Sequence, residues 1–299
     1  MFILHIDSGV EMRGGQWQAL YLMRGLVAAG HEIRLLAPAG SPLTEHALRD
    51  GLDARPLSIA ALGSATSGIH LIHAHDARAH TLALLGGKRV IVSRRVAFPV
   101  RRGVGSRWKY GRAAHYIAVS KCVRQTLIDG SIAPDRITVI YDGVPIQTLA
   151  LASERRSGVF ALDSDDPGKC KKIVEQAGSL ADIPVQFSKN LTEDLRRAAV
   201  FVYITELEGL GSAALLAMQA GAAVVASSVG GLPEIVEHGL TGLLTSNDPQ
   251  AVAGNIQRLL EDPALATRLS AAARVRVEKE FTIDRMVHAT LQVYERMLR

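Results

Sequence analysis

The segment 203–221 combines a carboxylate, a glycine-rich turn and the beginning of an apolar helix. Glu208 follows the end of an apolar strand, and Gly209 and Gly211 form a turn before a helix that should begin near Ser212. This order places Glu208 at the carboxyl end of a strand and turns the free N–H groups of the helix start outward, where an anion can bind. An ordinary strand–turn–helix with an exposed glutamate is the alternative, and the spacing alone favours it.

A second chemical feature is an acid-free basic segment between residues 77 and 128. It holds twelve Lys or Arg residues and no Asp or Glu, so it repels itself unless an anionic partner or solvent faces it. Phosphate esters, an acidic membrane surface and nucleic acid are the candidate partners, and a solvated basic face is the alternative. The aromatic residues within the segment are too sparse for a base-stacking platform, so we expect no nucleic acid. The basic residues are Arg78, Lys88, Arg89, Arg94, Arg95, Arg101, Arg102, Arg107, Lys109, Arg112, Lys121 and Arg124.

Two clusters offer metal-ligand residues, but neither is complete. The sequence Asp163-Ser-Asp-Asp166 lies in a loop after a strand, with no His or Glu ligand close in sequence. His73 and His75 lie on one face at the end of a strand, where they either line a cleft or support the strand. We therefore expect neither a metal ion nor another cofactor.

The composition is typical of a globular chain in a reducing compartment. Of the 299 residues, 48% are hydrophobic, which is too many for a disordered chain. Cys122 and Cys170 belong to no Cys-x-x-Cys pair, and the N-terminus lacks a basic signal-peptide region, so we expect a cytoplasmic protein. The uncharged stretch Gly209–Pro233 has the length of a membrane span, but its glycines, serines and Gln219 favour a buried helix followed by a buried strand.

Short β-rich runs alternate with amphipathic helical stretches in both halves of the chain. This alternation predicts an α/β fold with two open parallel sheets, whose ligands bind beyond the carboxyl ends of the strands. We expect an N-terminal domain at 1–145 and a shorter C-terminal domain at 146–299, with a linker at Pro145–Ser157. Packing of the last helix back on the first domain is an option. The expected strands are Phe2–Asp7, Glu32–Ala37, His70–His75, Arg89–Ser93, His115–Ser120, Ile137–Val144, Val159–Leu162, Pro184–Ser188, Val200–Ile204, Ala223–Ser227 and Gly242–Thr245. The expected helices are Gln16–Ala29, Thr81–Leu85, Lys121–Asp129, Pro249–Leu260, Pro263–Glu280 and Thr282–Leu298, with others beginning near Gly168, Thr192, Ser212 and Leu232.

Several of these segments together resemble the family 4, or group 1, glycosyltransferases. The stretch Glu208–Gly221 and the glycine-rich stretch Ala223–Leu244 look like the signature of that family. The resemblance runs from residue 1 to residue 299 and rests on motifs that are specific only in combination. Further segments that resemble the family's first domain are Met12–Trp17, Gly30–Arg34, His73–His75, Ile117–Ser120 and Pro134–Val144.

The resemblance implies the GT-B fold, two doubly wound Rossmann-like domains facing a cleft, and retaining glycosyl transfer from a nucleotide sugar without a metal. The nucleotide would lie on the second domain and the acceptor on the first. Glu208 would hold the donor sugar hydroxyls, while Gly14 and Gly15 would let the backbone approach the diphosphate. Charge on the sugar and diphosphate would be stabilised by the backbone of Gly209, Leu210, Gly211 and Ser212.

Three features depart from the family pattern. At the donor-binding position where the family has a second glutamate for the nucleotide ribose, this chain has Leu216. The opening Gly-Arg strand and diphosphate lysine are missing, as if one strand–helix unit were deleted, and Ala97 stands where a related stretch has aspartate. Each change removes a polar partner, at roughly 1.5–3 kcal/mol per charged hydrogen bond. Residues that could substitute at the diphosphate or acceptor are Lys169, Lys171, Lys172, Arg94, Arg95 and His75, although a solvated helix face is the alternative for the lysines.

Two hypotheses follow from these residues. The first is a retaining glycosyltransferase that moves a hexose from a nucleotide sugar to a cell-envelope glycan or lipid-linked acceptor. Its basic segment would hold an anionic acceptor or lie peripherally on the inner face of the membrane. The second is a catalytically degenerate relative that binds a glycan or a protein partner. The three departures favour the second hypothesis, whereas Glu208 with its glycine turn favours the first.

Overall fold

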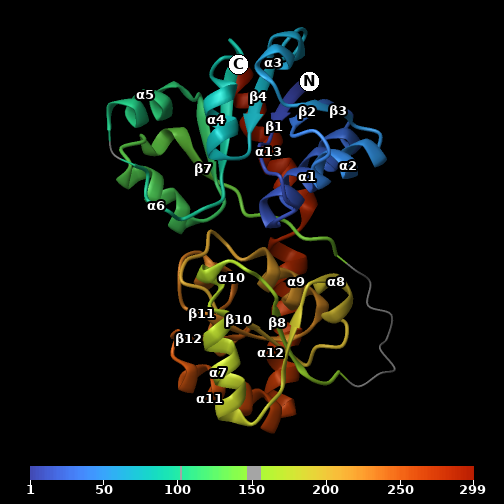
Figure 1. Cartoon of the computed structure of the whole chain (residues 1–299), viewed down its shortest axis with the longest axis vertical. Coiled ribbons are helices and arrows are strands. Elements are labelled where there is room, and N and C mark those ends of the chain that lie inside the picture. The colour runs from blue at the N-terminus through green and yellow to red at the C-terminus, as the bar shows by residue number, and fades with distance from the viewer. Residues whose placement is uncertain (102, 147–155) are drawn as a thin grey trace. The chain divides into compact units, whose positions relative to one another are not determined.

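The computed structural model describes residues 1–101, 103–146 and 156–299 (Figure 1). These residues form two compact units, each with its own parallel sheet and its own core. Unit 1 comprises Met1–Gly143 together with Ile283–Arg299, and unit 2 comprises Val144–Thr282. The second unit is therefore inserted, in chain order, into the first.

The two points at which the chain passes from one unit to the other are neighbours in space. The Val144 N–H donates a hydrogen bond to the Phe281 carbonyl at 2.9 Å. Val144 also pairs with Thr282 in an isolated parallel bridge. The inserted unit thus begins and ends at the same place.

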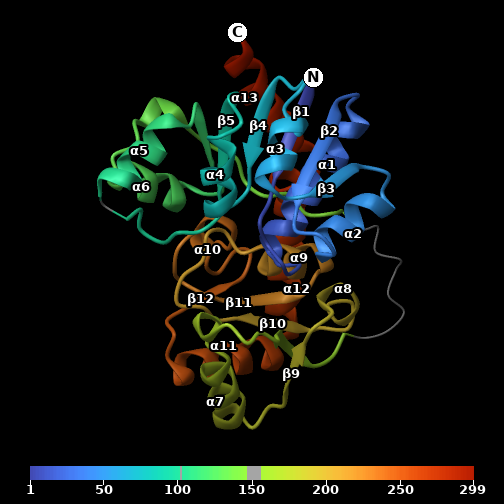
Figure 2. The same cartoon turned by 45° about the horizontal axis from the view of Figure 1, so that its top comes forward.

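Unit 1 is built on seven parallel strands in the order β3-β2-β1-β4-β5-β6-β7 (Figure 2). The central strands β1 and β4 are almost entirely buried, as expected for a sheet that is covered on both faces. Because all seven strands run in the same direction, their carboxyl ends and the following loops lie along one edge. The strands are β1 (Phe2–Ile6), β2 (Glu32–Ala37), β3 (Asp53–Pro56), β4 (Leu71–Ala74), β5 (Arg89–Arg94), β6 (His115–Ala118) and β7 (Ile137–Val139).

Two helices that are far apart in the sequence, α1 and α13, cover one face of this sheet together. Leu20 and Met23 of α1 join Val287 and Tyr294 of α13 in one apolar core. Their approach is close enough that a Cβ atom on Gly25 would collide with Val287. The helices of unit 1 are α1 (Gly14–Ala28), α2 (Pro42–Arg49), α3 (Ile59–Ala65), α4 (Ala77–Ala83), α5 (Val104–Arg112), α6 (Lys121–Asp129) and α13 (Ile283–Leu298), with a 3₁₀ turn, η1, at Pro134–Arg136.

Unit 2 contains a five-stranded parallel sheet in the order β12-β11-β10-β8-β9. Among the described residues β8 is the first strand, and it pairs directly with β10, so no other strand lies between them. This arrangement has no place for the opening strand that the family resemblance would supply. The strands are β8 (Val159–Leu162), β9 (Val185–Ser188), β10 (Val200–Tyr203), β11 (Ala223–Ser227) and β12 (Leu243–Thr245).

The helices of unit 2 complete its core and carry clear start signals. Asp248 and Asp262 cap α11 and α12 by accepting hydrogen bonds from backbone N–H groups in the first turn, and a proline follows each cap. The helices are α7 (Lys171–Ala181), α8 (Leu191–Asp194), α9 (Ser212–Ala220), α10 (Leu232–Ile235), α11 (Pro249–Glu261) and α12 (Pro263–Glu280), with a 3₁₀ turn, η2, at Pro167–Lys169.

The observed elements differ from the expected ones in several places. The structure contains α2, β3, α3 and α5, none of which the sequence pattern predicts. The helix expected at Thr81–Leu85 begins earlier, at Ala77, because the Asp76 carboxylate accepts the N–H groups of the first turn. The strand expected at Ile137–Val144 ends at Val139, where the chain leaves the sheet edge toward the boundary between the units.

The C-terminal residues follow unit 2 in the sequence but pack in unit 1. Residues 283–299, which chain order gives to the second domain, belong to unit 1 in the structure. Most of the expected linker, residues 147–155, lies outside the described residues. Within the described residues no helix is long and apolar enough to cross a membrane. The uncharged stretch Gly209–Pro233 forms α9, β11 and the start of α10.

Candidate functional site

The Glu208 carboxylate lies just beyond the carboxyl end of β10 and is held by three donors. The Lys169 ammonium and the Tyr203 hydroxyl both donate to Oε2 at 2.5 Å. The Gly209 N–H donates to Oε1 at 3.0 Å. The carboxylate is only 17% exposed, so its orientation is fixed by these contacts rather than by solvent.

Tyr203 is a member of this cluster that the sequence reasoning does not identify. It is the last residue of β10 and is buried, and its hydroxyl accepts a hydrogen bond from the Lys169 ammonium at 2.7 Å while donating to Glu208. The same ammonium lies 5.0 Å from the centre of the Tyr203 ring. Burial, together with the nearby Glu208 charge, holds the pKa of Tyr203 well above its usual value. The phenol therefore stays protonated and remains a donor to Glu208.

A ring of hydrogen bonds fixes the loop that carries Glu208. The Thr205 hydroxyl donates to the Gly168 carbonyl at 2.9 Å, which ties this loop to the one that carries Lys169. The Thr205 N–H donates to the Ser227 hydroxyl at 2.8 Å, and that hydroxyl donates to Asn247 at 2.6 Å. The Asn247 amide then donates back to the Thr205 carbonyl at 2.9 Å. The loops that follow β8, β10, β11 and β12 are joined in this way.

The glycines after β11 allow two backbone segments to pack directly on each other. The Gly231 N–H donates to the Glu208 carbonyl at 3.1 Å. A Cβ atom on Gly230 would collide with the Glu208 backbone, and one on Gly231 would collide with the Gly209 carbonyl. Gly211, with φ +111°, has a left-handed backbone that favours glycine. These glycines are therefore needed to position the turn at Glu208.

Leu216 lies on the less buried side of α9. Leu215, its neighbour, is completely buried, whereas Leu216 is only partly buried and shares this side with Ser212 and Ala213. Ser212 and Ala213 each precede Leu216 by about one helical turn, so the three residues form a stripe that begins at the helix N-terminus. Leu210, by contrast, is buried, with 2% of the residue exposed.

In unit 1 the glycines at the start of α1 lie near the carboxyl edge of the sheet. Gly14 is exposed, and a Cβ atom on Gly15 would meet only the Arg95 side chain, at an ordinary 3.8 Å. The fold itself therefore leaves room for a side chain at position 15. The nearby Asp7 carboxylate accepts the Gly9 N–H at 2.8 Å and the Gln16 amide at 3.1 Å. Burial raises the pKa of Asp7, and the charge of a second aspartate adds to the effect.

Three buried histidines lie at the carboxyl ends of β1 and β4. His75 Nε2 lies 2.8 Å from His5 Nδ1, and the Arg95 guanidinium lies 3.2 Å from His75 Nδ1. Burial lowers the pKa of all three rings, of His5 to about 3 and of His73 and His75 well below the usual value. All three are therefore neutral at pH 7. Because Arg95 only donates, His75 Nδ1 must accept, which makes His75 Nε2–H the donor to His5.

This arrangement is a poor site for a metal ion, although one nitrogen from each ring lies within 4.8 Å of the others. His73 has both ring nitrogens engaged, with the Tyr294 hydroxyl at 2.5 Å and the Ser93 hydroxyl at 2.8 Å. His75 is likewise occupied on both sides, and the Arg95 cation beside it would repel a second cation. Of the aspartates in the Asp-x-Asp loop, Asp163 pairs with Lys171 at 2.6 Å.

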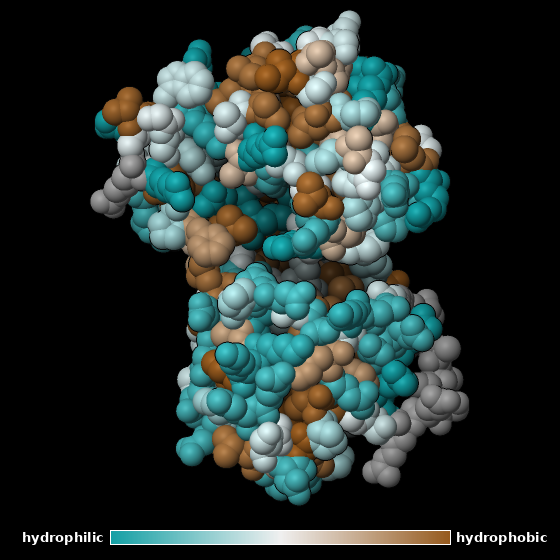
Figure 3. Space-filling view, in the orientation of Figure 1, coloured by the Kyte–Doolittle hydropathy of each residue, from teal (hydrophilic) through white to brown (hydrophobic). Residues whose placement is uncertain are grey.

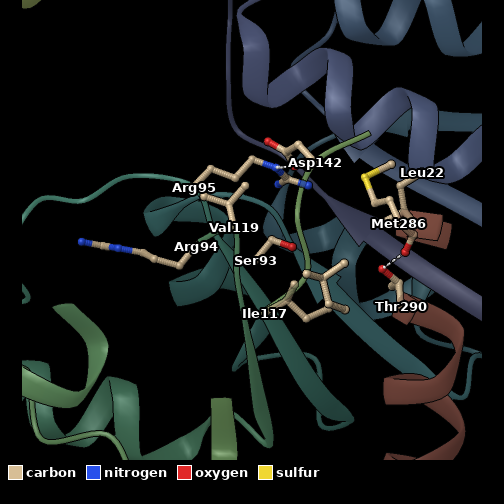
Figure 4. Close-up of a pocket in the computed structure, with 10 residues that line it drawn as sticks. Leu22, Ser93, Arg94, Arg95, Ile117, Val119, Asp142, Met286 and Thr290 are labelled. Atoms are coloured by element: carbon tan, nitrogen blue, oxygen red, sulfur yellow. Dashed lines mark hydrogen bonds and ion pairs between the residues drawn. The ribbon is translucent and has the colours of Figure 1, made fainter. Parts of the chain in front are cut away.

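Arg94 and Arg95, which are adjacent in sequence, point in different directions (Figure 4). Arg95 turns inward and pairs with Asp142 at 3.3 Å. Arg94 turns outward and donates to the Tyr110 hydroxyl at 3.0 Å and to the Phe98 carbonyl at 2.6 Å. Both arginines border a cavity of about 10 Å³, which has room for one water molecule at most and not for a sugar.

Both halves of the chain match known protein families. Residues 158–276 match the family described as "Glycosyl transferases group 1". Residues 12–148 match the family described as "Glycosyltransferase Family 4". The matches cover every strand of the two sheets except β1, together with the glycine-rich turn at Glu208.

Curated relatives share parts of this sequence. Alpha-maltose-1-phosphate synthase of Mycobacterium tuberculosis is 40% identical over 114 residues, which are 36% of this chain and 30% of the synthase. D-inositol 3-phosphate glycosyltransferase of Streptomyces avermitilis is 36% identical over 133 residues, which are 43% of this chain and 28% of that enzyme. The matched segments therefore span less than a third of the length of these relatives.

Solved structures match nearly the whole chain. Anabaena HepE, crystallised with UDP, superposes with a TM-score of 0.85 and 16% identity, covering 99% of this chain and 100% of that one. Sucrose-phosphate synthase of Thermosynechococcus elongatus superposes with a TM-score of 0.78 and 18% identity, covering 99% and 98%. At these identities the likeness establishes the fold, which is the two-sheet GT-B fold. The two family matches together cover residues 12–148 and 158–276, and the chain belongs to the group 1, or family 4, glycosyltransferases.

Proposed function

We propose that the protein transfers a hexose from a nucleotide sugar to an acceptor, with retention of configuration and without a metal ion. The observation that carries the proposal is the fixed Glu208 carboxylate beside Lys169 and the start of α9. Support also comes from the family matches and from the names of the relatives, which include a synthase and a glycosyltransferase. Three structures of HepE hold UDP, UDP with glucose, or UDP-glucose.

In this mechanism Glu208 accepts hydrogen bonds from hydroxyl groups of the donor sugar. Its Oε1 atom has only the Gly209 N–H as a described partner, so it has capacity for a sugar hydroxyl. Tyr203 and the Gly209 N–H keep the carboxylate in place while it does so. The Glu208 carboxylate thus orients the donor sugar so that the diphosphate can leave.

The leaving diphosphate needs positive charge, and two groups supply it. The Lys169 ammonium lies 2.5 Å from Glu208 and is 21% exposed, so it can reach a phosphate oxygen next to the sugar. The N–H groups at the start of α9 supply the positive end of a helix dipole. Together they would replace the arginine and lysine that the family carries on the strand–helix unit missing here.

The acceptor would bind at the carboxyl edge of unit 1. Arg95, whose side chain is 13% exposed, offers a cation there beside the neutral His75, and Gly15 leaves room for close approach. Such groups suit a polar or anionic acceptor, such as a cell-envelope glycan or a lipid-linked sugar. We place the reaction in the cytoplasm, at the inner face of the membrane.

The test is a screen of uridine, guanosine and adenosine diphosphate sugars for binding and turnover, followed by Glu208→Gln. We expect the substitution to lower turnover about 10²-fold or more, because it removes a charged acceptor from the sugar. Glu206→Gln, which changes an exposed neighbouring carboxylate, is the matched control and should leave the rate unchanged. Equal rates for the wild type and Glu208→Gln would remove Glu208 from the mechanism.

Leu216 supports a second candidate, a catalytically degenerate protein that binds nucleotide sugar or glycan without transfer. A leucine on the partly exposed stripe of α9 offers no partner to the ribose hydroxyls. This candidate predicts measurable ligand binding with no transferred sugar in the same screen. Release of nucleoside diphosphate in the presence of an acceptor would exclude it.

A further inference from the structure

The helix α5 differs from its neighbours because it contains no buried residue. Val104 and Trp108, which lie one turn apart on the same face, are 78% and 52% exposed. Phe98, in the loop before this helix, is 62% exposed. Apolar side chains of this size normally lie in a core, so three of them exposed together indicate a surface that another apolar phase covers. We call residues 96–101 and 103–112 the α5 surface.

The α5 surface is held in a fixed shape. The Arg94 guanidinium donates to the carbonyls of Val96 (3.2 Å) and Phe98 (2.6 Å) in the loop, and to the hydroxyl of Tyr110 (3.0 Å) in the helix. Ala97 and Val100 are each 8% exposed and so anchor the loop on either side of Phe98. Phe98 is thus directed outward by its buried neighbours and is tied to the helix through Arg94.

Positive charge surrounds these apolar side chains. Arg101, Arg107 and Arg112 are exposed, and the Arg112 guanidinium lies 4.9 Å from the centre of the Trp108 ring. No Asp or Glu occurs anywhere between residues 77 and 128. In Figure 3, apolar brown side chains lie beside hydrophilic teal ones over α5 at the upper left.

From this combination we infer that the α5 surface docks on an anionic lipid surface. Trp108, Phe98 and Val104 enter the interface, where an aromatic ring with a polar edge is most stable, and the arginines contact lipid phosphates. Charge alone would fit an acidic macromolecule in solution, but such a partner gives no reason for an isolated aliphatic side chain at 78% exposure on a basic helix. The inference rests on unit 1 alone and is independent of the donor chemistry in unit 2.

The chain offers a direct readout, because its two tryptophans differ in environment. Trp17 packs between Tyr21 and His46, and Trp108 is exposed. In Trp17→Phe, the emission of Trp108 should shift to the blue when vesicles of equal parts phosphatidylglycerol and phosphatidylcholine are added. Vesicles of phosphatidylcholine alone should give no shift. Added salt should reverse the shift, because charges are screened over about 8 Å at physiological ionic strength.

Co-sedimentation of the full chain with the same vesicles separates insertion from simple charge attraction. Phe98→Ala with Trp108→Ala should weaken binding at least tenfold, and Arg101→Gln or Arg107→Gln about fivefold each. Ile59→Ala, which trims a side chain that is 70% exposed elsewhere in unit 1, is the control and should bind like the wild type.

Three results would each overturn the inference. The first is no binding of the unaltered chain to anionic vesicles at low salt. The second is unchanged binding by the double alanine variant. The third is an equal shift of Trp108 with soluble polyglutamate, which would point to an acidic partner in solution. None of these measurements uses a nucleotide sugar, so their failure and a failure of the proposed transfer reaction are distinguishable.

Discussion

At the residue scale, Leu216 can be tested as a contact of the nucleotide. Because its side chain is only partly buried, Leu216→Glu should place a carboxylate beside the ligand without burying it fully. We predict that the variant binds nucleoside diphosphates roughly ten- to a hundredfold more tightly than the wild type, the equivalent of about 1.5–3 kcal/mol. Thermal melts with and without nucleotide measure this directly.

The control for that experiment is the adjacent residue. Leu215 is fully buried, so Leu215→Glu should lower the melting temperature sharply whether or not nucleotide is present. If Leu216→Glu also lowers the melting temperature, and nucleotide does not raise it again, Leu216 is a packing residue. The second candidate function, binding without transfer, then gains support.

Tyr203 is expected to act through Glu208 rather than on the substrate. Tyr203→Phe removes one of two hydrogen bonds to Oε2 and leaves Lys169 and Glu208 in place. We predict a loss of about ten- to a hundredfold in kcat, with a smaller change in the KM for the donor, because the carboxylate becomes less well oriented. Tyr21→Phe in unit 1 is the control. An unaltered kcat in Tyr203→Phe would show that Lys169 and Gly209 are enough to orient the Glu208 carboxylate.

The sequence identifies site residues that are close together in the chain but not those that meet over long distances. Glu208 and its glycine turn form one short motif and were identified from it. The contact of His73 with Tyr294 spans 221 positions, and no local pattern indicates it. Arg94, which is expected at the diphosphate or acceptor, directs three of its five N–H donors to two loop carbonyls and Tyr110, which only the structure shows.

At the scale of elements, the apolar strands were predicted well because a buried parallel strand is a short continuous apolar run. The elements that were missed lack such a run. β3 is a four-residue edge strand of sequence Asp-Ala-Arg-Pro, and α5 buries no side chain, so neither shows a core-facing periodicity. The position of β3 is set by its pairing with β2 and by the ion pair of Asp53 with Arg34, and α5 is held by the hydrogen bond from Arg94 to Tyr110.

The histidines at the ends of β1 and β4 should make the stability of unit 1 depend on pH. Their folded pKa values lie below the usual 6.5, so the unfolded chain binds more protons as the pH falls. The stabilisation is therefore complete above about pH 6.5 and is lost progressively below it, down to about pH 3 for His5. Each histidine should contribute a slope of about 1.4 kcal/mol per pH unit within its window.

Urea unfolding followed by tryptophan fluorescence measures this slope for unit 1 alone, because both tryptophans, Trp17 and Trp108, belong to that unit. In His5→Asn, the free energy of unfolding should depend less steeply on pH between about pH 4 and 6, by the slope that one histidine contributes. His288→Asn, which alters an exposed histidine on α13, should not. Identical slopes in all three proteins would mean that His5 takes up a proton without unfolding.

At the scale of the whole molecule, α13 is predicted to be essential to unit 1 and not to unit 2. Ending the chain after Thr282 removes four side chains of the hydrophobic core, Met286, Val287, Val293 and Tyr294. Loss of a large core side chain costs about 2–5 kcal/mol, so the loss of four costs roughly 8–20 kcal/mol, as much as the 5–15 kcal/mol that typically holds a domain together. The truncated chain should show solvent-exposed tryptophan emission, while the melting transition of unit 2 remains.

Removing Arg299 alone, an exposed residue, is the control for that truncation and should change neither transition. Native tryptophan emission from the chain that ends at Thr282 would show that the sheet of unit 1 can be covered without α13. Chain order alone does not give this division, because the helix that completes unit 1 follows the whole of unit 2.

The insertion of one unit into the other has a consequence for the newborn chain. The ribosome makes all seven strands of the first sheet and then all of residues 144–282 before it makes α13. At typical rates of synthesis this interval is on the order of ten seconds. Throughout it, the sheet face that α13 will cover is open to water, to proteases and to chaperones, while the inserted unit, whose ends already meet at Val144 and Thr282, is free to fold. The inserted unit is thus expected to mature first, although it is encoded second.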